Sequence, residues 1–202
     1  MRLYLRYMVS SRCKNVVKDQ LKKLNIKYSF SIHGAIIFLE LVTDYRLNEL
    51  KQNLKQYGII LLSESESLLI DKIINTVIEV VHNSEELPKT KFADLLSYKN
   101  ENILRIFSDV KGMSVLQYIV FQKIEKAKEL LVYENFSLLE ISEKLNYKNE
   151  RLFIRQFEKL TGLSPDYFIE IKNKREKNDM QFSHNTINTI SGYPARSVSS
   201  NM

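Results

Sequence analysis

The chain has 202 residues, of which 44% are hydrophobic and 27% charged, as in an ordinary globular protein of one large or two small domains. Five glycines and three prolines disfavour an architecture built from strands and turns. No run reaches the 18 apolar residues of a membrane span, residues 1–9 lack the apolar core of a secretory signal, and the lone Cys13 excludes an internal disulfide. We therefore expect a soluble, cytoplasmic protein.

The formal net charge of +6 is unevenly distributed along the chain. Residues 1–62 hold 11 Lys and Arg against 4 Asp and Glu, a net of +7, whereas residues 63–177 hold 18 against 19, a net of −1. Residues 178–202 balance at zero. Because a basic excess is usually a solubility feature, the bulk charge carries little weight for function.

The first 62 residues alternate between strand and helix patterns. Strand patterns cover residues 2–9, 27–32, 35–41 and 59–62. Helical spacing of apolar residues covers residues 13–24 and 44–57. His33-Gly34 predicts a hairpin turn between the middle strands, and Gly58 ends the second helix. The resulting order βαββαβ predicts a small ferredoxin-like domain over residues 1–63.

After Ser63 every periodic segment is helical. The predicted helices cover residues 66–82, 91–97, 100–110, 114–133, 138–145, 149–161 and 165–175, with a polar loop at 83–89. Residues 178–202 are rich in Ser, Asn and Thr, lack periodicity, and are predicted to be disordered. The fold class is therefore α+β, with an all-α domain over residues 64–177.

The helical half contains an internal repeat. Four ordered anchors recur after 49 or 50 residues: Tyr98-Lys-Asn-Glu with Tyr147-Lys-Asn-Glu, Arg105-Ile-Phe with Arg155-Gln-Phe, Gly112-Met-Ser with Gly162-Leu-Ser, and Tyr118 with Phe168. A tetrapeptide alone can recur by chance, but four anchors in the same order indicate a duplicated structural unit.

The second repeat has the pattern of a helix-turn-helix. Ser137 and Glu140 form a capping box that starts one helix, and Asn146 lies at the turn, where Asn tolerates a left-handed backbone. Asn149 caps the next helix and Gly162 ends it. In such units the second helix enters the major groove of DNA with its N-terminal residues toward the bases.

The segment between the two repeats predicts one unbroken helix, Val115–Tyr133, roughly 28 Å long. Successive major grooves on one side of B-DNA lie about 34 Å apart. A rigid helix of this length would hold two recognition helices in successive major grooves.

The run from Ser114 to Phe168 resembles the C-terminal double helix-turn-helix domain of AraC/XylS-type regulators. The motifs that carry the resemblance are Lys123–Leu131, Ser137-x-x-Glu-Ile-Ser, Leu145-Asn-Tyr, Phe153-x-Arg-x-Phe and Thr161-Gly-Leu-Ser-Pro. The resemblance extends over about residues 66–175. The chain departs from the family pattern at two places: Asn146 stands where the family usually has Gly, and the first unit has no glycine turn. The resemblance implies a sequence-specific DNA-binding transcriptional regulator, with double-stranded DNA as its partner and RNA polymerase as a further partner.

The resemblance also implies which side chains contact DNA. The base-facing positions are Glu101, Asn102 and Arg105 in the first unit and Glu150, Arg151 and Arg155 in the second; Lys99, Lys148 and Lys159 would contact phosphates. Arg pairs with guanine, Asn with adenine, and Glu accepts from cytosine. The alternative is that these residues only solvate the helix faces. Phe107 and Phe157 are predicted to be core residues.

The N-terminal domain offers a weak metal-site candidate, Cys13. Met8-x-Ser10-x-x-Cys13 resembles the loop of heavy-metal-associated ferredoxin-like domains, with Ser10 in place of the first cysteine. Because one thiolate and one hydroxyl bind a soft metal poorly, we predict no metal, while a metal- or thiol-responsive carrier or sensor is the alternative function.

Other uses of residues 1–62 remain open at this stage. An RNA-binding sheet would need Tyr4, Tyr28, Phe30 and Phe38 on an exposed face, and an RNP-like run, which the sequence lacks. Dimerisation through the sheet is equally plausible. No Ser/His/Asp, paired-carboxylate or P-loop pattern is present, so we predict neither an enzyme nor a cofactor.

Overall fold

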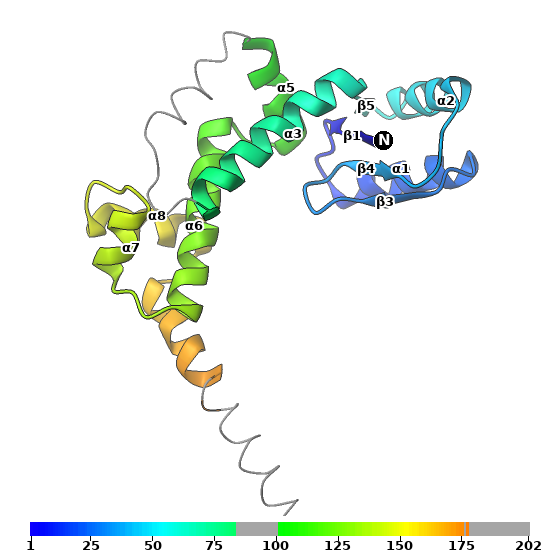
Figure 1. Ribbon diagram of the computed structural model, residues 1–202. Helices are drawn as coiled ribbons and strands as arrows, with labels where there is room; N and C mark the ends of the chain where they lie inside the picture. The colour runs from blue at the N-terminus through cyan, green and yellow to red at the C-terminus, as the bar shows by residue number, and fades with distance from the viewer. Residues whose placement is uncertain (84–100, 176, 178–202) are drawn as a thin grey trace, which may run out of the picture. The chain divides into compact units, whose positions relative to one another are not determined.

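The computed structural model describes residues 1–83, 101–175 and 177, and divides into two compact units, Met1–Lys123 and Ile124–Met202 (Figure 1). Residues 84–89 of the predicted loop, the predicted helix 91–97 and the predicted disordered tail 178–202 lie outside the described residues. No helix among the described residues is long and apolar enough to cross a membrane.

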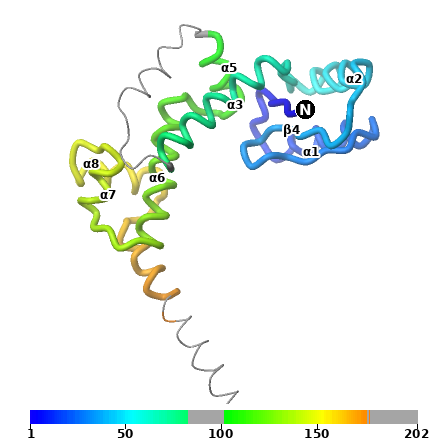
Figure 2. The backbone as a smooth tube through the Cα atoms, viewed as in Figure 1, coloured from blue at the N-terminus to red at the C-terminus, as the bar shows by residue number. Residues whose placement is uncertain are grey.

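The first 62 residues form short strands and two helices, whose backbone path can be followed in Figure 2. In chain order these are β1 (Arg2–Leu3), β2 (Leu5–Arg6), α1 (Ser11–Lys23), β3 (Tyr28–Phe30), β4 (Ile36–Phe38), α2 (Asp44–Lys55) and β5 (Ile60–Leu61). The order of helices and strands is the predicted one, except that the first predicted strand is divided in two.

All strand pairs are antiparallel and fall into two sheets. One has the order β1-β4-β3 and the other pairs β2 with β5. The predicted strand over residues 2–9 is wrong in length, because the chain changes sheet at Tyr4, whose amide donates to Ser67 Oγ at 3.1 Å. Tyr7 then adopts a left-handed φ of 63°, which ends the extended run.

The predicted hairpin between β3 and β4 is confirmed. Gly34 adopts a φ of 88°, where a side chain would be strained. The Ser31 amide donates to the Ala35 carbonyl at 2.9 Å, and the Ala35 amide donates to Ser31 Oγ at 2.9 Å. These bonds close the turn and set the register of the two strands.

The core of this region lies between the strands and helices α1 and α2. Its buried members are Leu3, Leu5, Val17, Leu21, Ile26, Ile36, Phe38, Leu50, Leu54, Ile59 and Leu61. Tyr28 and Phe30 pack against the same core, while Tyr4 is fully buried outside it. None of the four aromatic side chains, Tyr4, Tyr28, Phe30 and Phe38, is therefore exposed as an RNA-binding sheet would require.

The helices of the first unit begin with α3 (Glu64–Ile78), which runs into a π-helical turn, η1 (Glu79–Asn83). The predicted start at residue 66 is two residues late, because Ser63 and Glu66 form a capping box. After the residues that are not described, α5 (Glu101–Lys111) leads to α6 (Val115–Tyr133), which continues as one helix into the second unit.

The predicted domain boundary at residue 63 falls inside the first compact unit. Helix α3 packs against β1, and α5 packs against β2. Residues 1–62 and the first helices of the predicted helical domain therefore share one folded body.

The second unit contains the end of α6, then α7 (Leu138–Lys144), α8 (Glu150–Thr161) and a helix over residues 165–175. Its buried apolar residues include Leu131, Ile141, Leu145, Phe153 and Phe157. Lys172 Nζ donates to the Glu134 carbonyl at 2.7 Å and so ties the last helix to the end of α6.

Candidate nucleic-acid interface

Helix α7 begins at the predicted capping box. The Glu140 amide donates to Ser137 Oγ at 3.3 Å, and the Ser137 amide donates to Glu140 Oε2 at 2.7 Å. The Glu140 carboxylate accepts from the Ser137 amide and also from the Ser137 hydroxyl at 2.8 Å, and these two bonds to the ionised form hold the pKa of Glu140 below its usual value. The box satisfies amides that have no partner within the helix and fixes where α7 starts.

The turn between α7 and α8 depends on Asn146. This residue adopts a φ of 51°, as the sequence predicts, and its amide donates to the Glu143 carbonyl at 2.9 Å. The next amide, of Tyr147, donates to the Ser142 carbonyl at 2.9 Å. These bonds satisfy the last carbonyls of α7 and redirect the chain within a few residues.

Helix α8 has the predicted cap at each end. Asn149 Oδ1 accepts from the Leu152 amide at 2.9 Å, and Gly162 ends the helix with a left-handed φ of 74°. Phe153 and Phe157 are fully buried, which confirms that the repeat's phenylalanines are core residues. This packing fixes the rotation of α8 about its axis and hence the side chains that face outward.

The outward face of α8 is basic. Arg151, Arg155 and Lys159 follow one another at intervals of four residues and are all exposed, and Lys148 is exposed just before the helix. Residues four apart share one face of a helix, so three cations form a single stripe. Glu150 is only half-exposed and lies in the first turn, where a carboxylate interacts favourably with the helix dipole.

The first repeat places two of its predicted base-facing residues on α5. Asn102 and Arg105 are exposed, and Arg105 Nη2 donates to Asn102 Oδ1 at 3.2 Å. Phe107 is fully buried, as predicted. Glu101 begins α5 but its side chain, like all of Lys99, lies outside the described part of the structure.

Cys13 lies in the first turn of α1, where Ser10 is the cap. Its sulfur is 3.4 Å from Ser10 Oγ, and this hydrogen bond lowers the pKa of the thiol. Among the described residues there is no group of three or more His, Cys, Asp and Glu that could hold a metal.

One pair of residues that matters for α5 is not predicted from the sequence. Arg6, at the end of β2, forms an ion pair with Asp109 of α5. The two residues are 103 positions apart, and neither stands out in its local pattern. Only the tertiary structure brings them together.

Comparison with known families places a helix-turn-helix in the same segment. Residues 92–170 match the family model described as a helix-turn-helix domain. The match includes α5, α6, α7 and α8, and therefore both repeats.

Individual relatives carry similar segments. The chain is 31% identical over 102 residues to the HTH-type transcriptional regulator YtdP of Bacillus subtilis, covering 50% of this chain and 13% of YtdP. It is 28% identical over 101 residues to the F1 operon positive regulatory protein of Yersinia pestis, covering 48% of this chain and 34% of that protein. The chain thus spans only a minor part of the length of these relatives.

Among solved structures, the chain is similar to the DNA-binding domain of AdpA, a global transcriptional factor, in complex with a target DNA. The match covers 52% of this chain and 94% of the AdpA domain, at 19% identity and a TM-score of 0.44.

Proposed function

We propose that the protein is a sequence-specific DNA-binding transcriptional regulator of the AraC type, because residues 92–170 match a helix-turn-helix family model and its relatives are named as regulators. The observation that carries the proposal is α8 itself, whose basic face, with Arg151, Arg155 and Lys159 exposed, follows a short capped helix and a left-handed turn. In a helix-turn-helix, this second helix is the one that enters the major groove.

The proposed base contacts come from α8 and α5. Arg151 and Arg155 would donate to guanine, and Glu150 would accept from cytosine. On α5, Arg105 and Asn102 would have the corresponding role, with Glu101 at its start. The hydrogen bond between Arg105 and Asn102 supports this proposal, because it holds both side chains in one orientation before DNA arrives.

The proposed phosphate contacts are Lys99, Lys148 and Lys159. Contacts of this kind set affinity and its salt dependence rather than sequence preference. Helix α6, with 19 residues, is about 28 Å long, close to the ~34 Å between successive major grooves. We therefore propose that one chain places two recognition helices in successive grooves.

We also propose a role for each part of the chain. Residues 1–63 would form a ferredoxin-like sensor or interaction domain, supported by the order of the elements and by the pairing of β1 with β4 and of β2 with β5. Residues 64–177 would form the DNA-binding domain. The protein would act by binding rather than catalysis, and RNA polymerase and a second copy of the chain are its proposed protein partners.

A gel-shift titration on a selected DNA fragment tests the residues that read the sequence. Arg105→Ala and Arg155→Ala should each weaken specific binding by about tenfold or more, since one bidentate arginine–guanine pair contributes about 1–3 kcal/mol. Lys148→Ala should weaken binding to all sequences and reduce the slope of log K against log salt by about 1.

Arg12→Ala is the matched control, because Arg12 is exposed on α1 and its loss removes the same charge. If Arg105→Ala and Arg155→Ala bind as Arg12→Ala does, the assigned reading residues are wrong. If the wild-type chain shows no preference over random DNA at moderate salt, the proposed function is wrong.

A further inference from the structure

Helix α5, the proposed recognition helix of the first unit, is held at its C-terminal end by the N-terminal strands. The Arg6 guanidinium forms an ion pair with the Asp109 carboxylate, and the side chains are 17% and 22% exposed. The Tyr7 amide donates to the Asp109 carbonyl at 3.1 Å. Asp109 is therefore bound through both its side chain and its backbone.

The Arg6–Asp109 pair is the electrostatic centre of this contact. Arg6 Nε is buried and has no hydrogen-bond partner among the described residues. Arg6 Nη2 also donates to the Tyr7 hydroxyl at 2.7 Å, but this group is neutral. The Asp109 carboxylate therefore supplies the negative charge that compensates the partly desolvated guanidinium. The geometry of the pair thus ties the position of α5 to β2.

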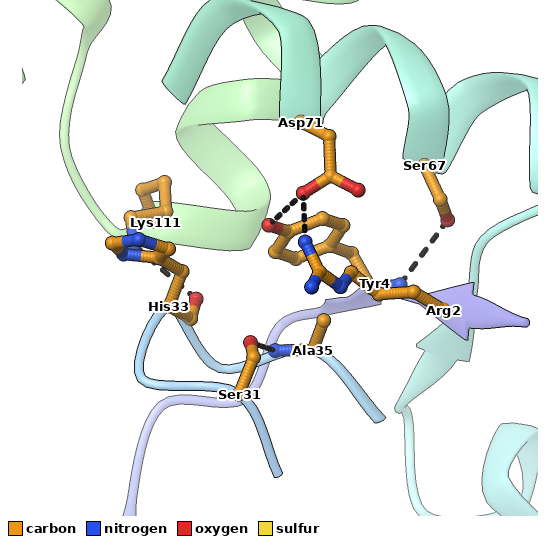
Figure 3. Close-up of polar contacts among 8 residues, drawn as sticks. All are labelled: Arg2, Tyr4, Ser31, His33, Ala35, Ser67, Asp71 and Lys111. Carbon is orange, nitrogen blue, oxygen red and sulfur yellow. Dashed lines mark hydrogen bonds and ion pairs between the residues drawn. The ribbon is translucent and has the colours of Figure 1, made fainter. Parts of the chain in front are cut away.

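A second contact joins the end of α5 to the β3–β4 hairpin. Lys111 Nζ donates to the His33 carbonyl at 3.3 Å and lies 5.2 Å from the centre of the Tyr118 ring. Figure 3 shows His33 and Lys111 side by side at the tip of the hairpin. Lys111 is the last residue of α5, so this contact fixes the terminus of the helix.

A third contact joins β1 to α3, the helix that packs beside α5. Tyr4 is fully buried, and its hydroxyl donates to Asp71 Oδ1 at 2.7 Å, an oxygen that also accepts from Arg2 Nη1 at 3.1 Å. Ser67 Oγ accepts the Tyr4 amide at 3.1 Å (Figure 3). The N-terminal strand therefore holds α3 as well as α5.

The length of α5 makes this support consequential. The helix has 11 residues, and a helix this short is marginal in water unless tertiary packing stabilises it. Arg105 lies one turn before Asp109 on the same helix, so a tilt about its C-terminal end would displace the side chains proposed to reach the bases. Helix α8 belongs to the other compact unit, Ile124–Met202.

We propose that residues 1–62 are the support that orients the first recognition helix, with Asp109 as its positioning residue and Arg6 as its anchor. The inference rests on the proposed function and adds to it that the two helix-turn-helix units differ in their dependence on the N-terminal region. Base reading by α5 requires the N-terminal region, whereas base reading by α8 does not. The basic excess of residues 1–62 serves in part to bind the acidic side chains of α3 and α5.

The test is a hydroxyl-radical footprint of the full-length chain on a selected DNA duplex, with Arg105→Ala and Arg155→Ala used to assign each protected segment to α5 or α8. Asp109→Asn should raise the protein concentration needed to protect the α5 segment by about tenfold and leave the α8 segment unchanged. Because this substitution makes the protein more positive, a purely electrostatic effect would strengthen binding instead.

Asp19→Asn is the matched control, with the same charge change on an exposed side chain of α1, and should leave both segments unchanged. Arg6→Met should weaken the α5 segment as Asp109→Asn does, while Arg6→Lys, which keeps the charge, should weaken it by less than about threefold. The double variant Arg6→Met with Asp109→Asn should be no weaker than either single variant, because each removes the same interaction.

The outcomes separate the two proposals. If the wild type protects no segment, the proposed function is wrong. If the wild type protects both segments and Asp109→Asn behaves as Asp19→Asn does, or weakens both equally, only the positioning role is overturned. Additive losses in the double variant also overturn it. If the Asp109→Asn protein has lost its helical circular dichroism, the footprint of Arg6→Lys is compared with that of the wild type instead. Weaker protection of both DNA segments to the same extent in Arg6→Lys would then contradict the proposal.

Discussion

Phe157 and Phe168 meet edge to face, with ring centres 5.2 Å apart and an interplanar angle of 89°. The same relationship recurs fifty residues earlier, where Phe107 meets Tyr118 at 5.6 Å and 68°. The sequence repeat is thus also a structural repeat, in which an aromatic ring on the second helix packs against one on the helix that follows the glycine stop. These contacts hold α5 and α8 against their neighbours.

Truncating the ring at the centre of the second repeat should destabilise that unit. Phe157→Ala should lower the free energy of unfolding by about 3–5 kcal/mol, because it leaves a cavity under α8 and removes the contact with Phe168. Leu160→Ala is the control on the same helix, since Leu160 is 47% exposed, and it should change stability by less than about 1 kcal/mol.

Amide hydrogen exchange of α8 measures this effect without requiring the whole chain to unfold in one step. Protection that falls equally in Phe157→Ala and Leu160→Ala would show that the aromatic contact does not stabilise the unit.

The left-handed turn predicts a second pair of variants. Asn146→Ala should destabilise the second unit by about 1 kcal/mol, because a side chain without a local hydrogen-bonding group pays the full cost of a positive φ. Asn146→Gly should leave stability within about 1 kcal/mol of wild type, since glycine adopts this conformation freely but loses more entropy on folding. Urea denaturation of both variants checks the order, and an Ala variant as stable as the Gly variant would contradict the assigned conformation.

The stability of the first unit should depend on the charge of His33. Burial, and then the positive charges of Lys111 and Arg2, lower the pKa of His33, while Asp71 acts in the opposite direction. Below the ordinary value of 6.5 the unfolded chain therefore binds a proton that the folded chain resists, and stability falls as the pH falls through 6.5.

His33→Asn removes this titration. Between about pH 7.5 and 5.5, the wild type should lose more stability than His33→Asn, as measured by thermal unfolding at several pH values. Equal slopes for the two proteins would show that His33 does not face these cations in solution.

Local signals predicted the second helix-turn-helix in detail. A capping box, a left-handed turn residue and a terminal glycine each act within a few residues, so Ser137, Asn146 and Gly162 reveal their roles from sequence alone. The division of the first strand at Tyr4 and the left-handed backbone of Tyr7 were not predictable in this way, because both depend on contacts with α3 and α5.

The contacts across residue 63 were not predictable for the same reason. The change from mixed to all-helical pattern at Ser63 predicts a boundary there, yet Tyr4 bonds to Asp71 and Arg6 to Asp109 across it. Ion pairs between distant residues leave no periodic trace in a sequence. The exposed faces of α5 and α8, by contrast, follow from the helical period once the buried phenylalanines are identified.

The most direct test of whether two recognition helices read DNA is a pooled-oligonucleotide binding selection with the purified full-length chain at moderate salt. We expect enrichment of a motif with two parts whose centres lie about 10–10.5 base pairs apart, the spacing of successive major grooves. Arg155→Ala should relax the preference in one part and Arg105→Ala in the other. A pool that stays random, or a single part altered equally by both variants, would contradict reading of DNA by two recognition helices.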